Sequence, residues 1–462
     1  MGSYSITNFM SKRNFILLII ILGLIVIAVF GLLYFQQKIT APKEDEGSGT
    51  NFISQFNPFG AKPTPPAVTL STDASEYQSD TGETQKIKLV KVSSMPVAGF
   101  TVFTKERLKE APMVASAAPS ADTEVENAVK KTTPAKKLIQ PLTEFALALR
   151  YVDKAIGNIY QTFVDKIEEQ KFSKTVIPKV YDSYFGNRGE SVVMRYLKED
   201  EKTIETFVGA LPKELLGKDT TTENEIKGSF LPDNIKDISV SPDGLKIFYL
   251  FISGNNLENS MVGATLNLLN NKKVQVFDST FTEWLSFWPT KNTITLTTKP
   301  SARVPGYMYS IDGAGKNLIK ILGGINGLTT LESLSGKLIL YGDNNLSLYV
   351  YHTDSRNSDV LGIKTLPEKC IWGKISDIIY CAAPKSIESG EYPDAWYQGE
   401  VSFNDQFWKI DIKTGNATLM LDPISIERGE EIDGIKLTLD EGENYLFFIN
   451  KKDSFLWKLD LK

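Results

Sequence analysis

The chain contains few of the residue types from which metal, cofactor and triad sites are built. Its 462 residues include one histidine, His352, and two cysteines, Cys370 and Cys381. A zinc site made of His and Cys ligands is therefore not expected, and a Ser-His-Asp triad would depend on His352 alone. The G-x-S-x-G, G-x-x-x-x-G-K-S/T and Rossmann glycine motifs are also missing. These absences predict no cofactor and no metal, and they favour a binding protein over an enzyme.

The sequence also lacks an excess of positive charge and, beyond residue 35, amphipathic helical patterns. Lys and Arg number 51 against 56 Asp and Glu, which gives a formal net charge of −5. A nucleic-acid partner, which requires a basic surface, is therefore not expected. Short runs of β-branched and aromatic residues take the place of helical patterns and predict an all-β body.

An uncharged apolar run extends from Phe15 to Phe35. A helix of about 21 residues spans the roughly 30 Å hydrocarbon core of a bilayer, so this run predicts a transmembrane helix in contact with lipid. Lys12 and Arg13 precede the run and Lys38 follows it. The positive-inside rule then places residues 1–14 in the cytoplasm and the body outside the cytoplasmic membrane. The alternative is a cleaved signal peptide, which has a shorter apolar core and a small-residue cleavage site.

Two segments have compositions that do not support a packed core. Residues 36–85 are rich in Pro, Gly, Ser, Thr and acidic residues, and they predict a flexible spacer. Residues from about 104 to 144 are similarly biased and lie between two strand-like segments. They predict a disordered insertion in a surface loop of the body, which comprises residues 86–462.

The body repeats a pattern of several short strands separated by turns. In its clearest copy, the turn Ser241-Pro242-Asp243-Gly244 leads into a strongly apolar strand. Similar apolar strands begin at Ala146, Val192, Lys246, Asn292, Lys337, Ser376 and Asn444. A period of roughly 40–50 residues with several strands per repeat is typical of a β-propeller. Seven such strands predict seven blades, and six or eight remain alternatives because the insertion splits the first repeat.

The two ends of the body are expected to meet in one blade. The last repeat lacks an outermost strand, and residues 86–92, KIKLVKV, form a strand-like segment before the first repeat. We predict that this segment completes the last blade, which closes the ring and removes an exposed sheet edge.

The Ser-Pro-Asp-Gly turn at 241–244 and strands of the form aromatic-x-apolar-Asp carry a resemblance to known proteins. These repeats resemble the TolB-type and WD-repeat-like propellers of bacterial envelope proteins, over most of residues 87–462. With its anchor and spacer, the chain resembles uncharacterised membrane-anchored propeller proteins of bacteria. The resemblance implies the fold and not an activity, because the same repeat occurs in enzymes, scaffolds and binding modules.

The two cysteines lie at the ends of a predicted hairpin, CIWGKISDIIYC. If Ile375 and Ser376 form a two-residue turn, Cys370 lies opposite Cys381 and Ile371 opposite Tyr380. Directly opposed Cβ atoms are close enough for a disulfide, which an extracytoplasmic compartment permits. The alternative is two buried free thiols.

The longest insertion between strands, residues 385–403, combines aromatic and acidic residues. Tyr392, Trp396 and Tyr397 surround Asp394. Such a group could stack against sugar rings or hold a basic peptide, so these four residues are the predicted binding site. The alternative is that the aromatic rings pack against their own blade.

Two functions follow from this organisation. The first is a membrane-anchored extracytoplasmic propeller that binds or scaffolds a protein or glycan of the bacterial cell envelope. The second is an envelope carbohydrate hydrolase or lyase that uses carboxylates near the ring axis; it predicts Asp, Glu, Arg and Tyr side chains around the mouth of the ring.

Overall fold

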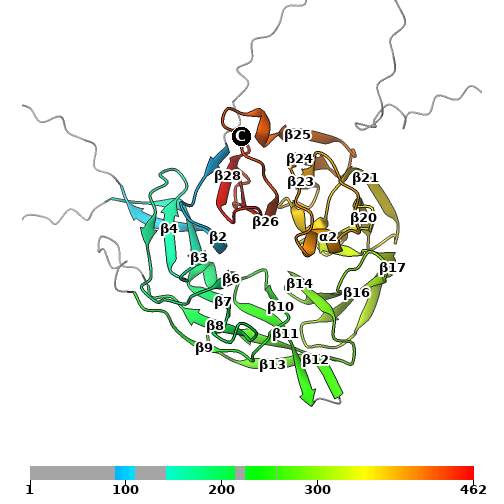
Figure 1. The fold of residues 1–462 in the computed structure, drawn as a ribbon, viewed down its shortest axis with the longest axis horizontal. Helices are drawn as coiled ribbons and strands as arrows, with labels where there is room; N and C mark the ends of the chain where they lie inside the picture. The colour runs from blue at the N-terminus through cyan, green and yellow to red at the C-terminus, as the bar shows by residue number, and fades with distance from the viewer. Residues whose placement is uncertain (1–88, 110–141, 214–223, 256–257) are drawn as a thin grey trace, which may run out of the picture. The chain divides into compact units, whose positions relative to one another are not determined.

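The body is a ring of seven four-stranded antiparallel sheets, so the predicted seven-bladed all-β propeller is confirmed (Figure 1). The structure is a computed structural model that describes residues 89–109, 142–213, 224–255 and 258–462. Each blade runs from an innermost strand at the ring axis to an outermost strand at the rim.

The strand bounds follow, with each blade given from the axis outward. Blades 1 to 3 comprise β2 (Val97–Leu108), β3 (Thr143–Asp153), β4 (Ile159–Phe163), β5 (Gln170–Lys171); β6 (Val180–Gly186), β7 (Ser191–Leu197), β8 (Ile204–Ala210), β9 (Lys227–Phe230); and β10 (Asp237–Val240), β11 (Lys246–Asn255), β12 (Glu258–Asn267), β13 (Lys273–Ser279). Blades 4 and 5 comprise β14 (Trp284–Thr290), β15 (Thr293–Thr298), β16 (Pro305–Asp312), β17 (Ile319–Asn326); and β18 (Thr329–Glu332), β19 (Leu338–Gly342), β20 (Ser347–His352), β21 (Ser358–Lys364). Blades 6 and 7 comprise β22 (Cys370–Trp372), β23 (Ile378–Pro384), β24 (Asp405–Asp411), β25 (Ala417–Leu421); and β26 (Gly434–Leu439), β27 (Tyr445–Asn450), β28 (Leu456–Asp460), β1 (Leu89–Lys91). The short helical elements are η2 (Asn187–Gly189), η3 (Pro367–Lys369), α2 (Asp394–Tyr397) and η4 (Pro423–Ser425).

The strand that opens the described chain completes the last blade. β1 pairs with β28 in the register Leu89 opposite Leu459 and Lys91 opposite Trp457. The Nζ atom of Lys91 also lies 4.9 Å from the ring centroid of Trp457. The predicted closure of the ring by strands from both ends of the body is therefore confirmed.

The alternating strand directions give the ring two different ends. The turns between first and second strands and between third and fourth strands gather at one end, which we call the turn end. The connections between second and third strands and between successive blades gather at the other, the loop end. Leu89 lies at the turn end, because its partner Leu459 is close to Leu461, whose backbone N–H donates to Asn444 in a turn of blade 7.

The hydrophobic core lies between neighbouring blades, where the second strands are covered on both faces. Phe248 and Leu250 of β11 pack with Trp284, Trp288 and Ile294 of blade 4, and all five side chains are buried. Each such side chain stabilises the fold by about 1.5–3 kcal/mol relative to an exposed one. This explains why the second strands are the most apolar segments of the sequence.

The Ser-Pro-Asp-Gly turn leads into the apolar strand β11 as predicted, and the cysteine hairpin has the predicted register. Gly244 adopts a φ of +69°, which glycine accepts without strain. Cys370 and Cys381 are bonded, with an S–S distance of 2.11 Å, and they lie opposite one another in the predicted register. The turn itself is longer than the predicted pair Ile375-Ser376: Ser376 donates to the carbonyl of Gly373 and takes a φ of +59°, because that pair is poorly suited to a two-residue hairpin.

The predicted insertion is narrower than expected. Thr104 pairs with Leu147 and Leu108 with Thr143, so β2 and β3 extend into the segment 104–144 from both sides. The rest of that prediction, together with the membrane helix Phe15–Phe35 and the spacer 36–85, lies outside the described residues. Within the described residues, no helix is long and apolar enough to cross a membrane.

Candidate functional site

The insertion between β23 and β24 forms a structured loop at the loop end of the ring. It contains the short helix α2, which lies close to the ring axis (Figure 1). Three aromatic residues of the loop, Tyr392, Trp396 and Phe403, pack with Leu346 of blade 5 and with Leu366, which follows the last strand of that blade. Tyr392 and Trp396 are only 3% and 4% exposed, so their rings are not free to stack against a ligand in this arrangement. Two of the four predicted binding residues therefore serve to hold the loop on the ring.

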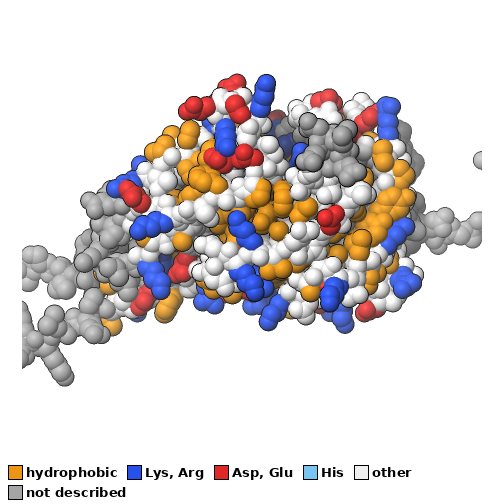
Figure 2. All heavy atoms as spheres, turned by 90° about the horizontal axis from the view of Figure 1, so that it is seen from below, with side chains coloured by type: hydrophobic (Ala, Val, Ile, Leu, Met, Phe, Trp, Pro, Cys, Tyr) orange, Lys and Arg blue, Asp and Glu red, His pale blue; other side chains and the backbone are white. Residues whose placement is uncertain are grey.

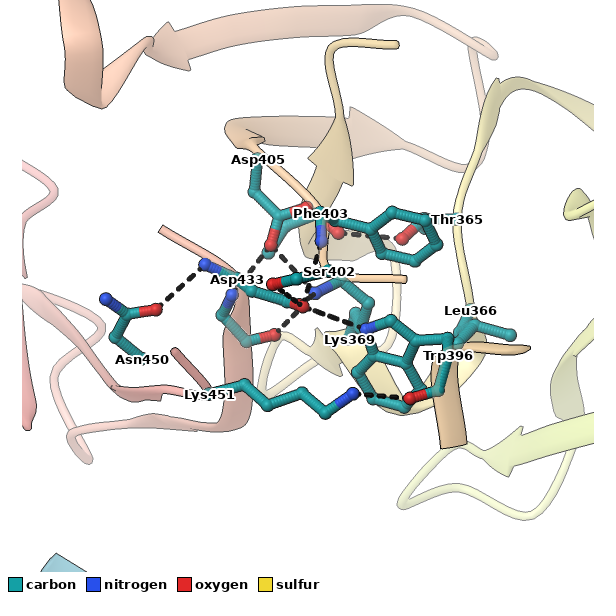
Figure 3. A network of polar contacts seen from close by, with 12 residues as sticks. Thr365, Leu366, Lys369, Trp396, Ser402, Phe403, Asp405, Asp433, Asn450 and Lys451 are labelled. Carbon is teal, nitrogen blue, oxygen red and sulfur yellow. Dashed lines mark hydrogen bonds and ion pairs between the residues drawn. The ribbon is translucent and has the colours of Figure 1, made fainter. Parts of the chain in front are cut away.

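A buried ionic network fastens the loop to blades 6 and 7 (Figure 3). Lys369, at the end of η3, places its Nζ atom 2.8 Å from Oδ2 of Asp405 and forms a second ion pair with Asp433. All three side chains are completely buried. Asp433 in turn accepts hydrogen bonds from Nε1 of Trp396 at 2.9 Å and from the backbone N–H of Phe403 at 3.0 Å. One carboxylate thus connects blade 7, the loop and the lysine of blade 6.

The two carboxyl groups of this network titrate differently. Burial raises the pKa of Asp405 to about 6, and the neighbouring Asp433 adds to the rise while Lys369 opposes it. Burial acts in the same sense on Asp433, but Lys369 and the hydrogen bonds from Phe403 and Trp396 outweigh it and lower its pKa. Asp433 is therefore the more readily ionised of the two carboxyl groups that pair with Lys369.

The loop also reaches across to other blades. Asp394 accepts a hydrogen bond of 2.6 Å from the backbone N–H of Ala302 in blade 4, and Glu391 accepts one of 2.9 Å from Nε of Arg303. From blade 7, Lys451 donates to the carbonyl of Trp396, and its Nζ atom lies 4.0 Å from the Trp396 ring centroid. The predicted site residue Asp394 thus positions the loop through a backbone contact.

Tyr397 is the predicted site residue that remains accessible. It is 41% exposed, and its hydroxyl donates a hydrogen bond to Glu368, an exposed residue of η3. The surrounding protein desolvates Glu368 and raises its pKa to about 7, although the bond from Tyr397 and the nearby Lys369 and Lys451 oppose the rise. The surrounding protein desolvates the Tyr397 hydroxyl, and this together with the Glu368 charge raises the pKa of Tyr397 well above its ordinary value. The pair combines a carboxyl group that titrates near neutral pH with an aromatic surface.

Other polar side chains from the innermost strands lie near the axis. Asp237 accepts hydrogen bonds from the backbone N–H and the hydroxyl of Ser286 at 2.5 and 2.8 Å, and burial nevertheless raises its pKa to about 6. The Asp237 charge also contributes to the raised pKa of Tyr397, so blade 3 and α2 face the same axial region. The ring axis at the loop end is therefore polar and charged.

A second ion pair crosses the inner edge of blade 1. Lys436 of β26 forms ion pairs with Asp182 of β6, and it donates to the carbonyl of Ala98 in β2 at 2.9 Å. Asp182 also pairs with Arg195 at 3.3 Å. Blades 7, 1 and 2 are thereby joined near the axis, where one carboxylate, Asp182, pairs with two cationic side chains, Lys436 and Arg195. Among the described residues, no group of three or more His, Cys, Asp or Glu side chains is arranged to hold a metal ion.

The sequence analysis missed Glu368 and Asp237. Neither belongs to a motif. The repeat did contain a usable signal. Charged residues occur within the first three positions of three innermost strands: Asp182 in β6, Asp237 in β10 and Lys436 in β26. Glu368 lies two residues before the innermost strand β22. Aligning the repeats at their first strands would have placed these charged side chains together at the axis.

No protein family model matches the sequence, and no curated protein is similar to it. Solved structures with a similar fold include an oligogalacturonate lyase from Vibrio parahaemolyticus, with 9% identity over 69% of this chain and 86% of that one and a TM-score of 0.48. An oligogalacturonate lyase in complex with manganese has 9% identity over 68% and 86%, with a TM-score of 0.48. TolB from Acinetobacter baumannii has 10% identity over 67% and 61%, with a TM-score of 0.34. The chain's own topology, seven blades of four antiparallel strands, makes it a β-propeller.

Proposed function

We propose that the chain is a membrane-anchored extracytoplasmic propeller of the bacterial cell envelope that binds a basic segment of a partner protein at Glu368 and Tyr397. The observation that carries this proposal is the loop 385–404, which the buried network of Lys369, Asp405 and Asp433 fastens to the ring. That network would be needed to hold Tyr397 beside Glu368 in a fixed geometry. Preorganised aromatic and charged groups of this kind are typical of binding sites.

The charge of the pair favours a cationic ligand. Within the described residues, Glu368 forms no ion pair and has Tyr397 as its hydrogen-bond partner. An incoming lysine or arginine would form a direct ion pair with Glu368, and the Tyr397 ring would offer a face for its aliphatic or cationic part. The predicted anchor at Phe15–Phe35 and the spacer 36–85 would present this end of the ring to envelope proteins.

The test is binding of defined peptides to the full chain, measured by calorimetry. A lysine-rich peptide is expected to bind, whereas peptides with neutral or acidic residues at the same positions are not. Glu368→Gln is expected to weaken binding at least about tenfold. The matched control is Glu388→Gln, which removes an exposed carboxylate from the same loop. Equal affinity of the wild-type protein and Glu368→Gln would refute the assignment of the site.

A second function is favoured by one observation. A carboxyl group with a pKa of about 7 beside a tyrosine is suited to general acid–base chemistry, which the hydrolase or lyase alternative requires. Incubation with acidic and neutral envelope glycans, followed by measurement of new reducing ends and unsaturated products, separates the two functions. Turnover that disappears in both Glu368→Gln and Tyr397→Phe would favour the enzyme, and its absence with retained peptide binding would favour the binding module.

A further inference from the structure

The turn end of the ring carries a group of lysines on blades 3 to 5, together with exposed leucines. We call this group the turn-end patch. Its lysines are Lys246, Lys272, Lys291, Lys316 and Lys337, and its leucines are Leu269, Leu318 and Leu334. The leucines are 61%, 54% and 55% exposed, although leucine side chains are usually buried. No site described above uses any of these residues.

The patch spans three neighbouring blades whose turns pack against the adjacent blade. In blade 3, the backbone N–H of Leu268 donates to the carbonyl of Leu245 at 2.9 Å, which joins its two turns. Blade 4 contacts blade 3 where Gly315 approaches the carbonyl of Val276 so closely that a Cβ atom would lie 1.9 Å from it. Blade 5 contacts blade 4 where a Cβ on Gly336 would lie 3.4 Å from Thr290.

The patch is positively charged although the chain as a whole is acidic. Among the described residues, none of its five lysines takes part in an ion pair, and all five are exposed. Asp243, Asp312 and Asp354 lie in turns of the same three blades, so the five lysines outnumber the carboxylates there. On the side shown in Figure 2, Lys and Arg side chains are more numerous than Asp and Glu side chains along the lower edge, whereas Asp and Glu side chains are more frequent along the upper edge.

We propose that the turn-end patch docks on a bilayer surface rich in anionic phospholipid. Lysines attract anionic headgroups, and leucines at the tips of turns can enter the boundary between headgroups and acyl chains. The place where the chain enters the ring supports a membrane as the binding partner. The first described residue, Leu89, lies at the turn end, and the predicted membrane helix precedes it in the sequence. If the predicted spacer, residues 36–85, behaves as a flexible chain, its end-to-end distance would be about 40 Å, which would allow the ring to reach the membrane that holds the predicted helix.

Docking through this patch would fix the orientation of the ring. Asp440, Glu441 and Glu443 occupy the turn end at blade 7, so anionic lipid repels that side and attracts blades 3 to 5. The ring would therefore lie tilted, with its loop end and the pair Glu368 and Tyr397 directed away from the lipid. The inference shares the membrane anchor with the proposed function but makes a separate claim about which surface faces the bilayer.

The test uses the full chain reconstituted into vesicles of phosphatidylcholine alone or of phosphatidylcholine with phosphatidylglycerol. Backbone hydrogen exchange is followed in the turns 268–272 and 313–318. Exchange in these turns is expected to slow in the anionic vesicles only, and the effect is expected to fade at high salt. Lys272→Gln with Lys316→Gln is expected to lower the ratio of docked to free rings by about fivefold for each lysine removed.

The matched control replaces two exposed lysines of the loop end, Lys202→Gln with Lys299→Gln, and is expected to leave the protection unchanged. Equal exchange in both kinds of vesicle would overturn the proposal, as would protection that survives the loss of Lys272 and Lys316. Protection by soluble heparin but not by anionic vesicles would assign the patch to a soluble polyanion and overturn the membrane proposal. Co-flotation with neutral vesicles tests the predicted membrane helix alone, because these vesicles lack anionic lipid. A protein that does not co-float would contradict the membrane anchor, whereas one that co-floats without protection of the turns in anionic vesicles would contradict only the turn-end patch.

Discussion

The Nζ atom of Lys369 lies 2.8 Å from Oδ2 of Asp405, and both side chains are completely shielded from solvent. Lys369→Met would leave Asp405 and Asp433 without their counter-ion in the interior. We expect this change to lower the free energy of unfolding by about 3–5 kcal/mol, measured by urea denaturation. The control is Lys385→Met, which breaks the exposed pair with Asp422 and is expected to cost at most about 1 kcal/mol. Equal losses in both variants would contradict the buried role of Lys369.

A buried carboxyl group in blade 5 makes stability depend on pH. Glu332 is 7% exposed, and burial raises its pKa from 4.5 to about 7. Below pH 4.5 the group is protonated in both states. Between pH 4.5 and 7 it is ionised chiefly in the unfolded state, so stability falls as pH rises through this window.

Glu332→Gln is therefore expected to stabilise the protein at pH 8 by up to about 3 kcal/mol and to have little effect at pH 4. The measurement is urea denaturation of both proteins across this range. A stabilisation that is the same at both pH values would show that ionisation of Glu332 is not its cause.

Ligand binding at Glu368 is expected to respond to pH near neutrality. With a pKa of about 7, the carboxyl group is mostly protonated at pH 6 and mostly ionised at pH 8. Affinity for the lysine-rich peptide should rise by about tenfold over this interval, because the peptide stays cationic while the site gains its negative charge. Calorimetry of Glu368→Gln should show a flat profile. A rise that persists in that variant would assign the titration to another group.

The disulfide between Cys370 and Cys381 is expected to stabilise blade 6. It closes a short loop and therefore restricts the unfolded chain, which is worth about 2–3 kcal/mol for a loop of this size. Reduction should lower the urea midpoint of the wild-type protein and leave the Cys370→Ala/Cys381→Ala variant unaffected. If the reductant shifts both proteins equally, the bond contributes nothing to stability.

The repeat could be read from the sequence because the blades bury their second strands. The run from Lys246 to Ile252 and the strand at Tyr445–Asn450 are apolar enough to stand out, and their spacing predicts the ring. The register of Cys370 with Cys381 follows from the symmetry of a short hairpin. Closure by residues 86–92 could be inferred because the last repeat lacked a strand.

The rest depends on contacts that no local pattern reveals. Lys369 and Asp433 are 64 residues apart, and nothing near either residue marks them as partners. Tyr392 and Trp396 have the same composition around them whether the loop binds a ligand or packs on its own ring, so only the fold separates these outcomes. Residues 104–108 include three charged side chains, so their sequence does not indicate a strand. Their strand conformation is seen only in the pairing of β2 with β3.

The pairing of β1 with β28 has a consequence for the order of synthesis. Leu89 leaves the ribosome hundreds of residues before Leu459, its partner across the sheet. β1 must therefore remain unpaired until β28 has been synthesised, and contacts this distant in sequence form slowly. Any polypeptide interrupted before Leu456 retains two open sheet edges, which are prone to aggregate or to be degraded. The ring can therefore close only in chains that have been synthesised through β28.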